Sequence, residues 1–354
     1  MITEETYMHR CIQLAKSGAG YVAPNPMVGA LLVHEERIIG EGYHQEYGQA
    51  HAEVNCVNSV SEEDKHLISS STLYVSLEPC SHYGKTPPCS TRIIHERISK
   101  VIIGCRDPFK EVAGKGIEQL QNAGVDVAVG VLENDCKELN KRFLTFHTQH
   151  RPYIILKWAQ TANGKIATLS NERLFITNEF TNRAVHKWRS EEMGILIGTN
   201  TALKDNPELT NRLWSGKNPV RLIVDMHLRL PSSSKIFDQQ QPTIIFNALR
   251  QENGNVRYYQ VTEDVSIVHQ ILNACYQNNI QSIIVEGGAK LLQSFIDEDL
   301  WDEARIIANE ILHIENGLPS PELSNYKFSH SENIFTDRIS YYYNRSFPFK
   351  TNAE

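Results

Sequence analysis

The sequence lacks any apolar run long enough to cross a membrane, because a helical span needs about 18–20 consecutive apolar residues. Its longer apolar runs, such as residues 28–33, have the length of a strand. An excess of positive charge is also missing, since 35 Lys and Arg stand against 42 Asp and Glu, for a formal net charge of −7. Proteins that bind duplex nucleic acid usually present a basic face, so neither a membrane protein nor a nucleic-acid-binding module is expected.

Cysteine is too sparse for a disulfide framework, with seven residues spread over 354. The acidic start, Met1-Ile-Thr-Glu-Glu, is unlike a secretory signal peptide. We therefore expect a cytoplasmic protein with reduced thiols. Most of these thiols are expected to be ordinary packing residues, namely Cys11, Cys56, Cys105, Cys136 and Cys275.

Length and hydrophobic pattern predict two α/β domains of similar size. After an opening hairpin at residues 28–34 and 38–43, the first half alternates strands with helices of about ten residues, which indicates a largely parallel sheet. Its last predicted helix runs over residues 133–146. A polar stretch then ends in Arg151-Pro152, so we expect domains at 1–147 and 148–354.

One imidazole and two thiols form a candidate zinc site. His51 is expected at the start of a helix, Cys80 at the end of a strand and Cys89 nine residues later. Three protein ligands leave the fourth zinc position to water, whose pKa the metal lowers toward ~7. Glu53 could carry a proton from that water to a leaving amine, which predicts hydrolytic deamination of a heterocycle.

The other histidines leave one alternative open, a closed structural zinc site with His44 or His82 as fourth ligand. Five more are expected on the surface: His9, His66, His95, His186 and His330. His-x-Glu followed by Pro-Cys is the known zinc-deaminase pattern. Here eight residues, rather than the usual two, separate the cysteines.

With these motifs the chain resembles the bifunctional riboflavin-biosynthesis deaminase/reductase family (RibD/RibG). In the first half the resemblance rests on Pro-Asn-Pro-Met-Val-Gly at 24–29, Gly-Tyr-His at 42–44, His-Ala-Glu at 51–53, the segment 78–89 with its Gly-Lys-Thr-Pro-Pro insert, and Asp-Pro at 107–108. In the second half it rests on Lys157, residues 163–167 and 176–177, Asp-Asn-Pro at 205–207, Arg221 with Asp225, and Glu-Gly-Gly at 286–288.

The resemblance implies a cytidine-deaminase-like α/β/α sandwich followed by a dihydrofolate-reductase-like α/β domain. The first domain would use zinc to deaminate 2,5-diamino-6-ribosylamino-4(3H)-pyrimidinone 5′-phosphate. The second would use NADPH to reduce 5-amino-6-(5-phosphoribosylamino)uracil to the ribityl compound. The partners implied are phosphorylated pyrimidines, with no nucleic acid or membrane, and the chain would form a homo-oligomer through the reductase domain.

By the same resemblance, four residues would contact the deaminase substrate. The amide of Asn25 suits the edge of a pyrimidine, and Lys85 with Thr86 suits a phosphate. Asp107 could accept a hydrogen bond from a ribose hydroxyl, although a simple Asp-Pro turn is an equal alternative. Phe109 stands where the family often has a polar Asn, which removes one expected contact.

The reductase half has no Gly-x-Gly-x-x-Gly after a strand, which disfavours a Rossmann domain. Gly287-Gly288, between a predicted strand and helix, is our preferred site for the NADPH phosphates. The resemblance places the cofactor at Ala159, Phe175, Thr201, Asp205, Gly288, Ala289, Lys290, Leu291 and Leu292. It places the reductase substrate at Arg173, Arg189, Leu209, Arg212 and Glu286. Arg173 and Met226 both depart from the family pattern at ligand contacts.

Two other functions stay open at this point. A nucleic-acid base deaminase would share the zinc chemistry but needs a basic groove, which the net charge disfavours. A zinc-stabilised scaffold without activity is disfavoured by the intact set of His51, Glu53, Cys80 and Cys89.

Overall fold

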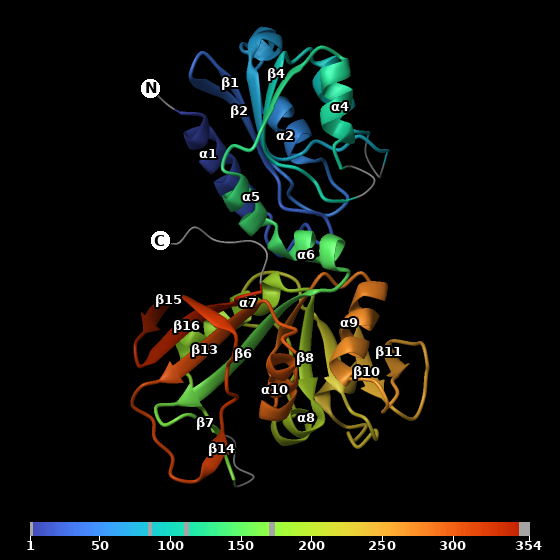
Figure 1. Cartoon of the computed structure of the whole chain (residues 1–354), viewed down its shortest axis with the longest axis vertical. Helices are drawn as coiled ribbons and strands as arrows, with labels where there is room; N and C mark the ends of the chain where they lie inside the picture. Colours follow the sequence, from blue (N-terminus) through green and yellow to red (C-terminus); the bar gives the residue numbers. More distant parts are fainter. Residues whose placement is uncertain (1–2, 84–86, 110–112, 170–173, 347–354) are drawn as a thin grey trace. The chain divides into compact units, whose positions relative to one another are not determined.

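The computed structural model describes residues 3–83, 87–109, 113–169 and 174–346. The chain divides into two compact units, the first ending at Gln149 and the second beginning at His150 (Figure 1). Both units are α/β, as predicted. The boundary predicted at residue 147 lies inside helix α6 (Lys141–Gln149).

The first unit is built on a five-stranded sheet of order β2-β1-β3-β4-β5. The strands are β1 Gly29–His34, β2 Arg37–Tyr43, β3 Thr72–Leu77, β4 Lys100–Cys105 and β5 Asp126–Val129. The helices are α1 Glu4–Lys16, α2 Ala52–Asn58, α3 Cys89–His95, α4 Lys115–Asn122, α5 Glu133–Leu139 and α6, with a 3-10 helix at Lys65–Ser70. Strand β1 is antiparallel to β2 and β3, and β3, β4 and β5 are parallel, which confirms the predicted hairpin and parallel sheet.

Alternation along β1 separates the two cores of this unit. Ala30 and Leu32 face a cluster with residues of α2, α3 and α4, while Leu31 and Val33 face a cluster with residues of α1 and α5. Side chains of a strand point alternately to opposite faces, so the sheet is the middle of three layers. The five thiols expected to pack in the core are buried, as predicted.

Glycine in β2 sets the position of α2. A Cβ atom on Gly42 would lie 2.2 Å from the backbone nitrogen of Cys56, so only glycine allows the helix this close to the strand. Helix α2 carries Glu53 and follows His51, and this close approach therefore fixes two of the candidate site residues.

The single helix predicted over residues 133–146 is wrong, because α5 and α6 are separate helices. Asn140 is the C-cap of α5 and lies between the two helices. Its Oδ1 accepts a hydrogen bond from the backbone N–H of Met27, and its Nδ2 donates to the carbonyl of Met27, both at 2.8 Å. The partner lies 113 residues away in the chain, so the hydrophobic pattern carries no sign of this contact.

The second unit is built on a nine-stranded sheet of order β11-β10-β9-β8-β12-β6-β13-β16-β15. The strands are β6 Tyr153–Thr161, β8 Gly194–Gly198, β9 Val220–Val224, β10 Thr243–Asn247, β11 Val256–Gln260, β12 Ser282–Val285, β13 Glu303–Asn309, β15 Tyr326–Ile334 and β16 Asp337–Asn344. Strands β7 (Lys165–Thr168) and β14 (Gly317–Pro319) form a separate pair. The helices are α7 Glu179–Glu191, α8 Thr199–Asp205, α9 Ile267–Gln277 and α10 Ala289–Asp297, with a 3-10 helix at Lys235–Phe237.

Helices cover both faces of this sheet (Figure 1). Helices α9 and α10 contribute side chains to one core cluster, which includes Ala304 of β13. On the opposite face the guanidinium of Arg305, also in β13, lies 4.8 Å from the ring of Trp188 of α7. The sequence pattern missed β13 because two of its residues, Glu303 and Arg305, are charged yet buried as an ion pair at 2.6 Å.

None of the helices in the described part of the chain is both long and apolar enough to cross a membrane.

Replacing Asn140 by Ala should destabilise the first unit by about 2 kcal/mol, because two buried hydrogen bonds to Met27 are lost. Hydrogen exchange of amides in residues 3–149, followed against urea concentration, measures this change. The control Asn122→Ala, at an exposed helix end, should shift it by less than about 0.5 kcal/mol. Equal effects of the two substitutions would contradict the role given to Asn140.

Candidate active sites

The candidate zinc ligands lie together in the first unit. His51 is the N-cap of α2 with no side-chain capping bond, Cys80 follows β3, and Cys89 is the first residue of α3. The Nδ1 atom of His51 lies 3.6 Å from Sγ of Cys80 and 3.4 Å from Sγ of Cys89. Nitrogen and sulfur ligands of a tetrahedral zinc lie roughly 3.5 Å apart, so the donor set fits this metal.

Of the two sulfur atoms, that of Cys80 lies in surroundings that favour a thiolate, whereas a hydrogen bond to Cys80 and burial raise the pKa of Cys89. A hydrogen bond from Cys89, and a further one from His51, lower the pKa of Cys80 to about 4 in spite of its burial. The backbone N–H of Cys89 also donates to Sγ of Cys80, at 3.4 Å. Zinc binds the thiolate form of cysteine, so this arrangement suits metal binding.

Glu53 lies in the first turn of α2, with only 3% of its surface exposed. Burial raises the pKa of this carboxyl group above its ordinary value, and the negative charge of Cys80 acts in the same direction. A buried carboxyl with a raised pKa beside a metal site is suited to accept and return a proton near neutral pH.

His44 is a neighbour of the zinc ligands rather than one of them. Its Nδ1 lies 3.1 Å from the carbonyl of Ala50, and a carbonyl only accepts, so Nδ1 carries the proton. Its Nε2 then accepts from the amide of Asn25, at 3.2 Å. Within the described residues, the only group with metal-ligand spacing is His51, Cys80 and Cys89, which does not support a closed site completed by His44 or His82.

This arrangement places the predicted substrate residue Asn25 beside the zinc cluster, because the ring of His44 packs edge-on against His51 with centroids 5.1 Å apart. Asp107 is buried, and its Oδ1 accepts from the backbone N–H of Phe109 at 2.8 Å, which is the turn considered as its alternative role. Burial raises the pKa of Asp107 to about 7. The predicted phosphate residues Lys85 and Thr86 lie outside the described residues.

Glu78 is a residue of this site that the sequence reasoning did not single out for a role. It is buried between β3 and Cys80. Its carboxylate accepts hydrogen bonds of 3.1–3.4 Å from four backbone amides, those of Asp107, Gly114, Gly116 and Ile117. The sequence signal for this role was the position of Glu78 two residues before Cys80. A carboxylate there can fix the backbone that carries the candidate ligand.

A charged cluster occupies the second unit. Glu286, just after β12, makes two bonds of 2.7 Å to the guanidinium of Arg189 in α7 and lies 3.6 Å from Nζ of Lys157 in β6. Burial alone would raise the pKa of Glu286, but Arg189 and Lys157 outweigh it and hold the pKa at about 2. The structure therefore brings two predicted substrate residues, Arg189 and Glu286, into direct contact.

His186 corrects one prediction. His9, His66, His95 and His330 are exposed as expected, but His186 is only 4% exposed. It lies three residues before Arg189 on the same side of α7, and burial together with Arg189 lowers its pKa to about 4. A lone histidine in a charged helix sequence gave no sign of this burial.

The Gly287-Gly288 turn has the geometry of a phosphate cradle. Gly288 has φ +77° and caps α10 without a side chain. A Cβ atom on Gly287 would lie 2.9 Å from the side chain of Thr201, so this predicted cofactor residue adjoins the turn. Backbone amides that open a helix behind glycines can approach a pyrophosphate, and the turn fits the phosphates of NADPH.

Other predicted cofactor residues differ in what they can offer. The side chains of Leu291 and Leu292 are buried in the core cluster, so only their backbone could face a ligand. Lys290 and Phe175 are exposed. Three more predicted residues are partly exposed, namely Ala159, Asp205 and Ala289.

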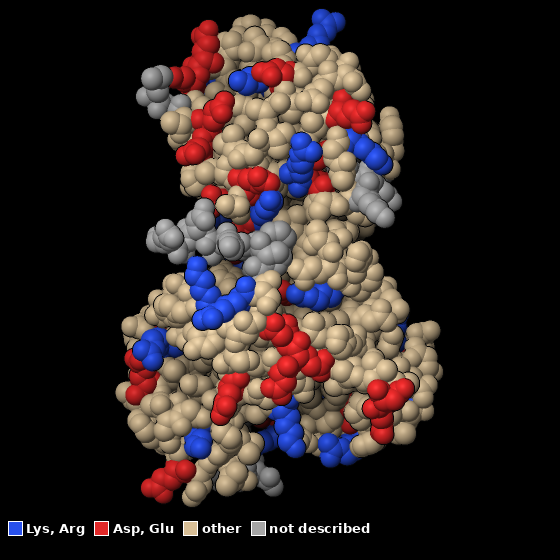
Figure 2. Space-filling view, viewed as in Figure 1, with Lys and Arg blue, Asp and Glu red and all other residues tan. Residues whose placement is uncertain are grey.

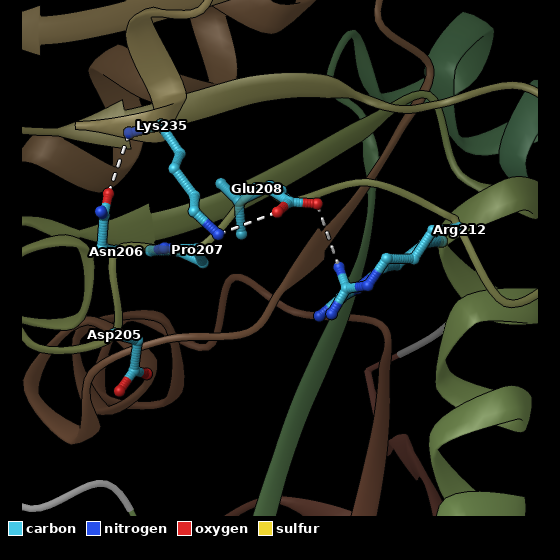
Figure 3. A pocket seen from close by; sticks show the side chains of 8 residues that line it. Asp205, Asn206, Pro207, Glu208, Arg212 and Lys235 are labelled. Atoms are coloured by element: carbon cyan, nitrogen blue, oxygen red, sulfur yellow. Dashed lines mark hydrogen bonds and ion pairs between the residues drawn. The ribbon is translucent and has the colours of Figure 1, made fainter. Parts of the chain in front are cut away.

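A pocket of about 100 Å³ adjoins the charged cluster of Glu286, because Arg189 belongs to both. Figure 3 shows side chains that line this pocket. Four predicted residues line it, namely Arg189, Asp205, Leu209 and Arg212, together with Asn206, Pro207, Glu208 and Lys235. The sequence reasoning missed Glu208 and Lys235 as site residues. Arg173 lies outside the described residues, and Met226 is partly buried against the core.

Two family models match separate parts of the chain. Residues 1–105 match the cytidine and deoxycytidylate deaminase zinc-binding region, and residues 152–312 match the RibD C-terminal domain. The chain is 40% identical over 305 residues to the riboflavin biosynthesis protein RibD of Aquifex aeolicus, covering 84% of this chain and 85% of that protein. RibD of Bacillus amyloliquefaciens is 39% identical over 319 residues, covering 87% of this chain and 85% of its own.

Solved structures agree over almost the whole length. A diaminohydroxyphosphoribosylaminopyrimidine deaminase/5-amino-6-(5-phosphoribosylamino)uracil reductase from Thermotoga maritima is 35% identical, with a TM-score of 0.87 over 96% of this chain and 98% of that one. RibD of Acinetobacter baumannii is 30% identical with the same TM-score and coverage. The chain therefore belongs to the RibD family of riboflavin biosynthesis, with a zinc-binding deaminase region followed by a RibD-type reductase domain.

Proposed function

We propose that the two units catalyse consecutive steps on one phosphorylated pyrimidine, and that the division of labour falls near residue 147. The first unit removes an amino group from 2,5-diamino-6-ribosylamino-4(3H)-pyrimidinone 5′-phosphate. The second reduces the sugar of 5-amino-6-(5-phosphoribosylamino)uracil with NADPH. The observation that carries the proposal is the buried carboxyl of Glu53 beside the His51, Cys80 and Cys89 donor set.

In the deaminase, His51, Cys80 and Cys89 would hold the zinc ion. Bound zinc lowers the pKa of a water ligand and so supplies hydroxide at neutral pH. Glu53 would accept a proton from the hydrolytic water and pass it to the amino nitrogen of the substrate. A C–O bond forms, the C–N bond breaks, and ammonia leaves.

The pyrimidine is oriented by residues around the zinc cluster. Because His44 accepts a hydrogen bond from the Asn25 amide, the oxygen of that amide is left to accept from an amino group of the ring. Asp107, which is buried near Glu78, is proposed to accept a hydrogen bond from a ribose hydroxyl. Lys85 and Thr86 are proposed to bind the 5′-phosphate.

In the reductase, the Gly287-Gly288 turn, with Thr201 beside it, is proposed to hold the NADPH phosphates. NADPH supplies the hydride, and the protein supplies position and charge. Glu286 keeps Arg189 and Lys157 charged and in place in a buried setting, so that Arg189 and Arg212 can hold an anionic substrate.

Acidic and basic side chains of the described residues are interspersed on the face drawn in Figure 2. This supports small phosphorylated pyrimidines as partners, with positive charge concentrated locally at the sites rather than over a broad surface. The cytoplasmic location and a homo-oligomer formed through the reductase domain stay predictions.

Replacing Glu53 by Gln should lower the rate of ammonia release by at least about 100-fold, because the proton carrier is lost. Reduction of the deaminated intermediate should continue at its original rate. The matched control is Glu63→Gln, at an exposed carboxylate of the same unit. Deamination that survives in the Glu53 variant would refute the role of this residue.

Replacing Cys89 by Ser should abolish stoichiometric zinc binding, because a thiolate ligand is lost. Zinc content of the purified chain, measured by elemental analysis, tests this. The control Cys275→Ser changes a buried thiol in α9 and should leave about one zinc per chain. Equal zinc content in the two variants would contradict the proposed ligand set.

Replacing Gly288 by Ala should raise the KM for NADPH about tenfold, because φ +77° strains a residue with a side chain at the proposed phosphate turn. Steady-state kinetics with the deaminated intermediate measure it. Gly254→Ala is the control, since a Cβ atom there meets no atom closer than 3.5 Å. An unchanged KM for NADPH would exclude this turn as the cofactor site.

A further inference from the structure

The pocket beside Arg189 contains a lysine and a glutamate to which neither the family resemblance nor the proposed mechanism gives a role. Figure 3 shows Glu208 between Lys235 and Arg212, with dashed lines to both. One carboxylate oxygen lies 2.9 Å from Nζ of Lys235, and the other lies 3.7 Å from Nη1 of Arg212. Two cations from different segments therefore share one anion.

The main chain around this group is held firmly. The side chain of Arg221 is fully buried, donates from Nε to the carbonyl of Glu208 at 2.9 Å, and donates from Nη1 to the carbonyl of Ile236 at 3.1 Å. It also makes two bonds to the carboxylate of Asp238. Arg221 thus fixes the backbone of Glu208 and of the residue after Lys235 relative to each other.

A second tie acts on Lys235 itself. Its backbone N–H donates to Oδ1 of Asn206 at 2.9 Å, and Asn206 ends α8 in the left-handed conformation. Gln241 donates to the carbonyls of Glu208 and Leu209. Lys235 and Glu208 are therefore presented from an ordered backbone, which lowers the entropic cost of binding an anion there.

The side chains themselves stay accessible. Lys235 is 53% exposed, Arg212 55% and Glu208 38%. Ion pairs at this exposure contribute little to stability, so an incoming anion could displace the carboxylate at small cost. The fork of an arginine matches a phosphate as well as a carboxylate, and a phosphate dianion carries twice the charge.

We propose that Lys235, together with Arg212, binds the 5′-phosphate of the reductase substrate, and that the Glu208 carboxylate holds the two cations in place until the phosphate replaces it. This assignment rests on the proposed reductase function. It makes Lys235 a substrate-binding residue. Glu208 weakens binding instead, because its carboxylate competes with the phosphate for the same two cations.

Substitution of Lys235 tests the first part. Lys235→Met should raise the KM for 5-amino-6-(5-phosphoribosylamino)uracil about tenfold and leave kcat within about twofold. With the dephosphorylated compound, the variant and the original chain should have the same KM. The control Lys327→Met removes an exposed lysine of β15 and should change neither value. The same loss of affinity should appear in a calorimetric titration of the phosphorylated compound without NADPH.

Substitution of Glu208 tests the second part, with inorganic phosphate as the probe. Glu208→Gln should lower the concentration of phosphate that half-inhibits the reductase by about threefold or more, because the internal anion is removed. The control Glu310→Gln disrupts a comparable exposed pair, with Arg338 at 3.3 Å, and should have no effect on inhibition. Weaker inhibition in the Glu208 variant would overturn the competitor role.

The cofactor also carries a phosphate, on its adenosine ribose, and the same kinetics separate the two sources. If Lys235→Met raises the KM for NADPH and not for the phosphorylated substrate, the pocket binds the cofactor and the proposal is overturned. Equal KM values for the substrate in both chains also overturn it. If the original chain reduces no substrate at all, the proposed reductase function fails instead, which keeps the two failures distinct.

Discussion

The geometry of the deaminase site depends on one buried carboxylate. Glu78 accepts hydrogen bonds from four backbone amides in the stretch from Asp107 to Ile117, and it stands two residues before Cys80. Four amide donors supply the polar environment that a buried charge needs. The strand end that provides a metal ligand is thereby fixed to the start of α4. Only glycine at position 116 allows this close contact, because a Cβ atom there would lie 2.0 Å from the carbonyl oxygen of Pro79.

In the second unit, too, buried carboxylates connect separate segments, but their partners include cationic side chains. Glu286 is held by two cationic side chains, and Asp302 accepts from both Nη atoms of Arg151 and from the backbone N–H of Ile154. Each carboxylate joins segments far apart in sequence. A buried ion pair adds little net stability over apolar packing, but removal of one partner leaves a charge uncompensated. Glu286 therefore fixes segments at the candidate site, and Asp302 fixes the start of β6.

Much of the architecture could be predicted because the hydrophobic periods are strong. Strands β1 and β2 lie within one residue of the hairpin predicted at 28–34 and 38–43, since each is a short apolar run next to turn residues. The pattern failed where polar side chains replace apolar ones inside the fold. Asn140 bonds to Met27 at the point where the predicted helix is interrupted. Glu303 and Arg305 give the sequence of β13 a polar pattern that is typical of a loop.

The candidate sites divide in the same way. His51, Cys80 and Cys89 could be predicted because zinc chemistry dictates residue types and allows few spacings. Lys235 and Glu208 could not, since exposed charges 27 residues apart are ordinary in any sequence. Only the fold shows that Arg221 and Asn206 bring them together.

The Asn140–Met27 exchange has a practical meaning for dissecting the protein. Met27 belongs to the Pro-Asn-Pro-Met segment that contains the proposed substrate residue Asn25, so the residue that separates α5 from α6 also holds this loop. A deaminase fragment that stopped at the end of α5 would contain every metal ligand and still leave this loop without its anchor. A deaminase unit prepared on its own should therefore extend beyond Asn140, well past the last candidate zinc ligand.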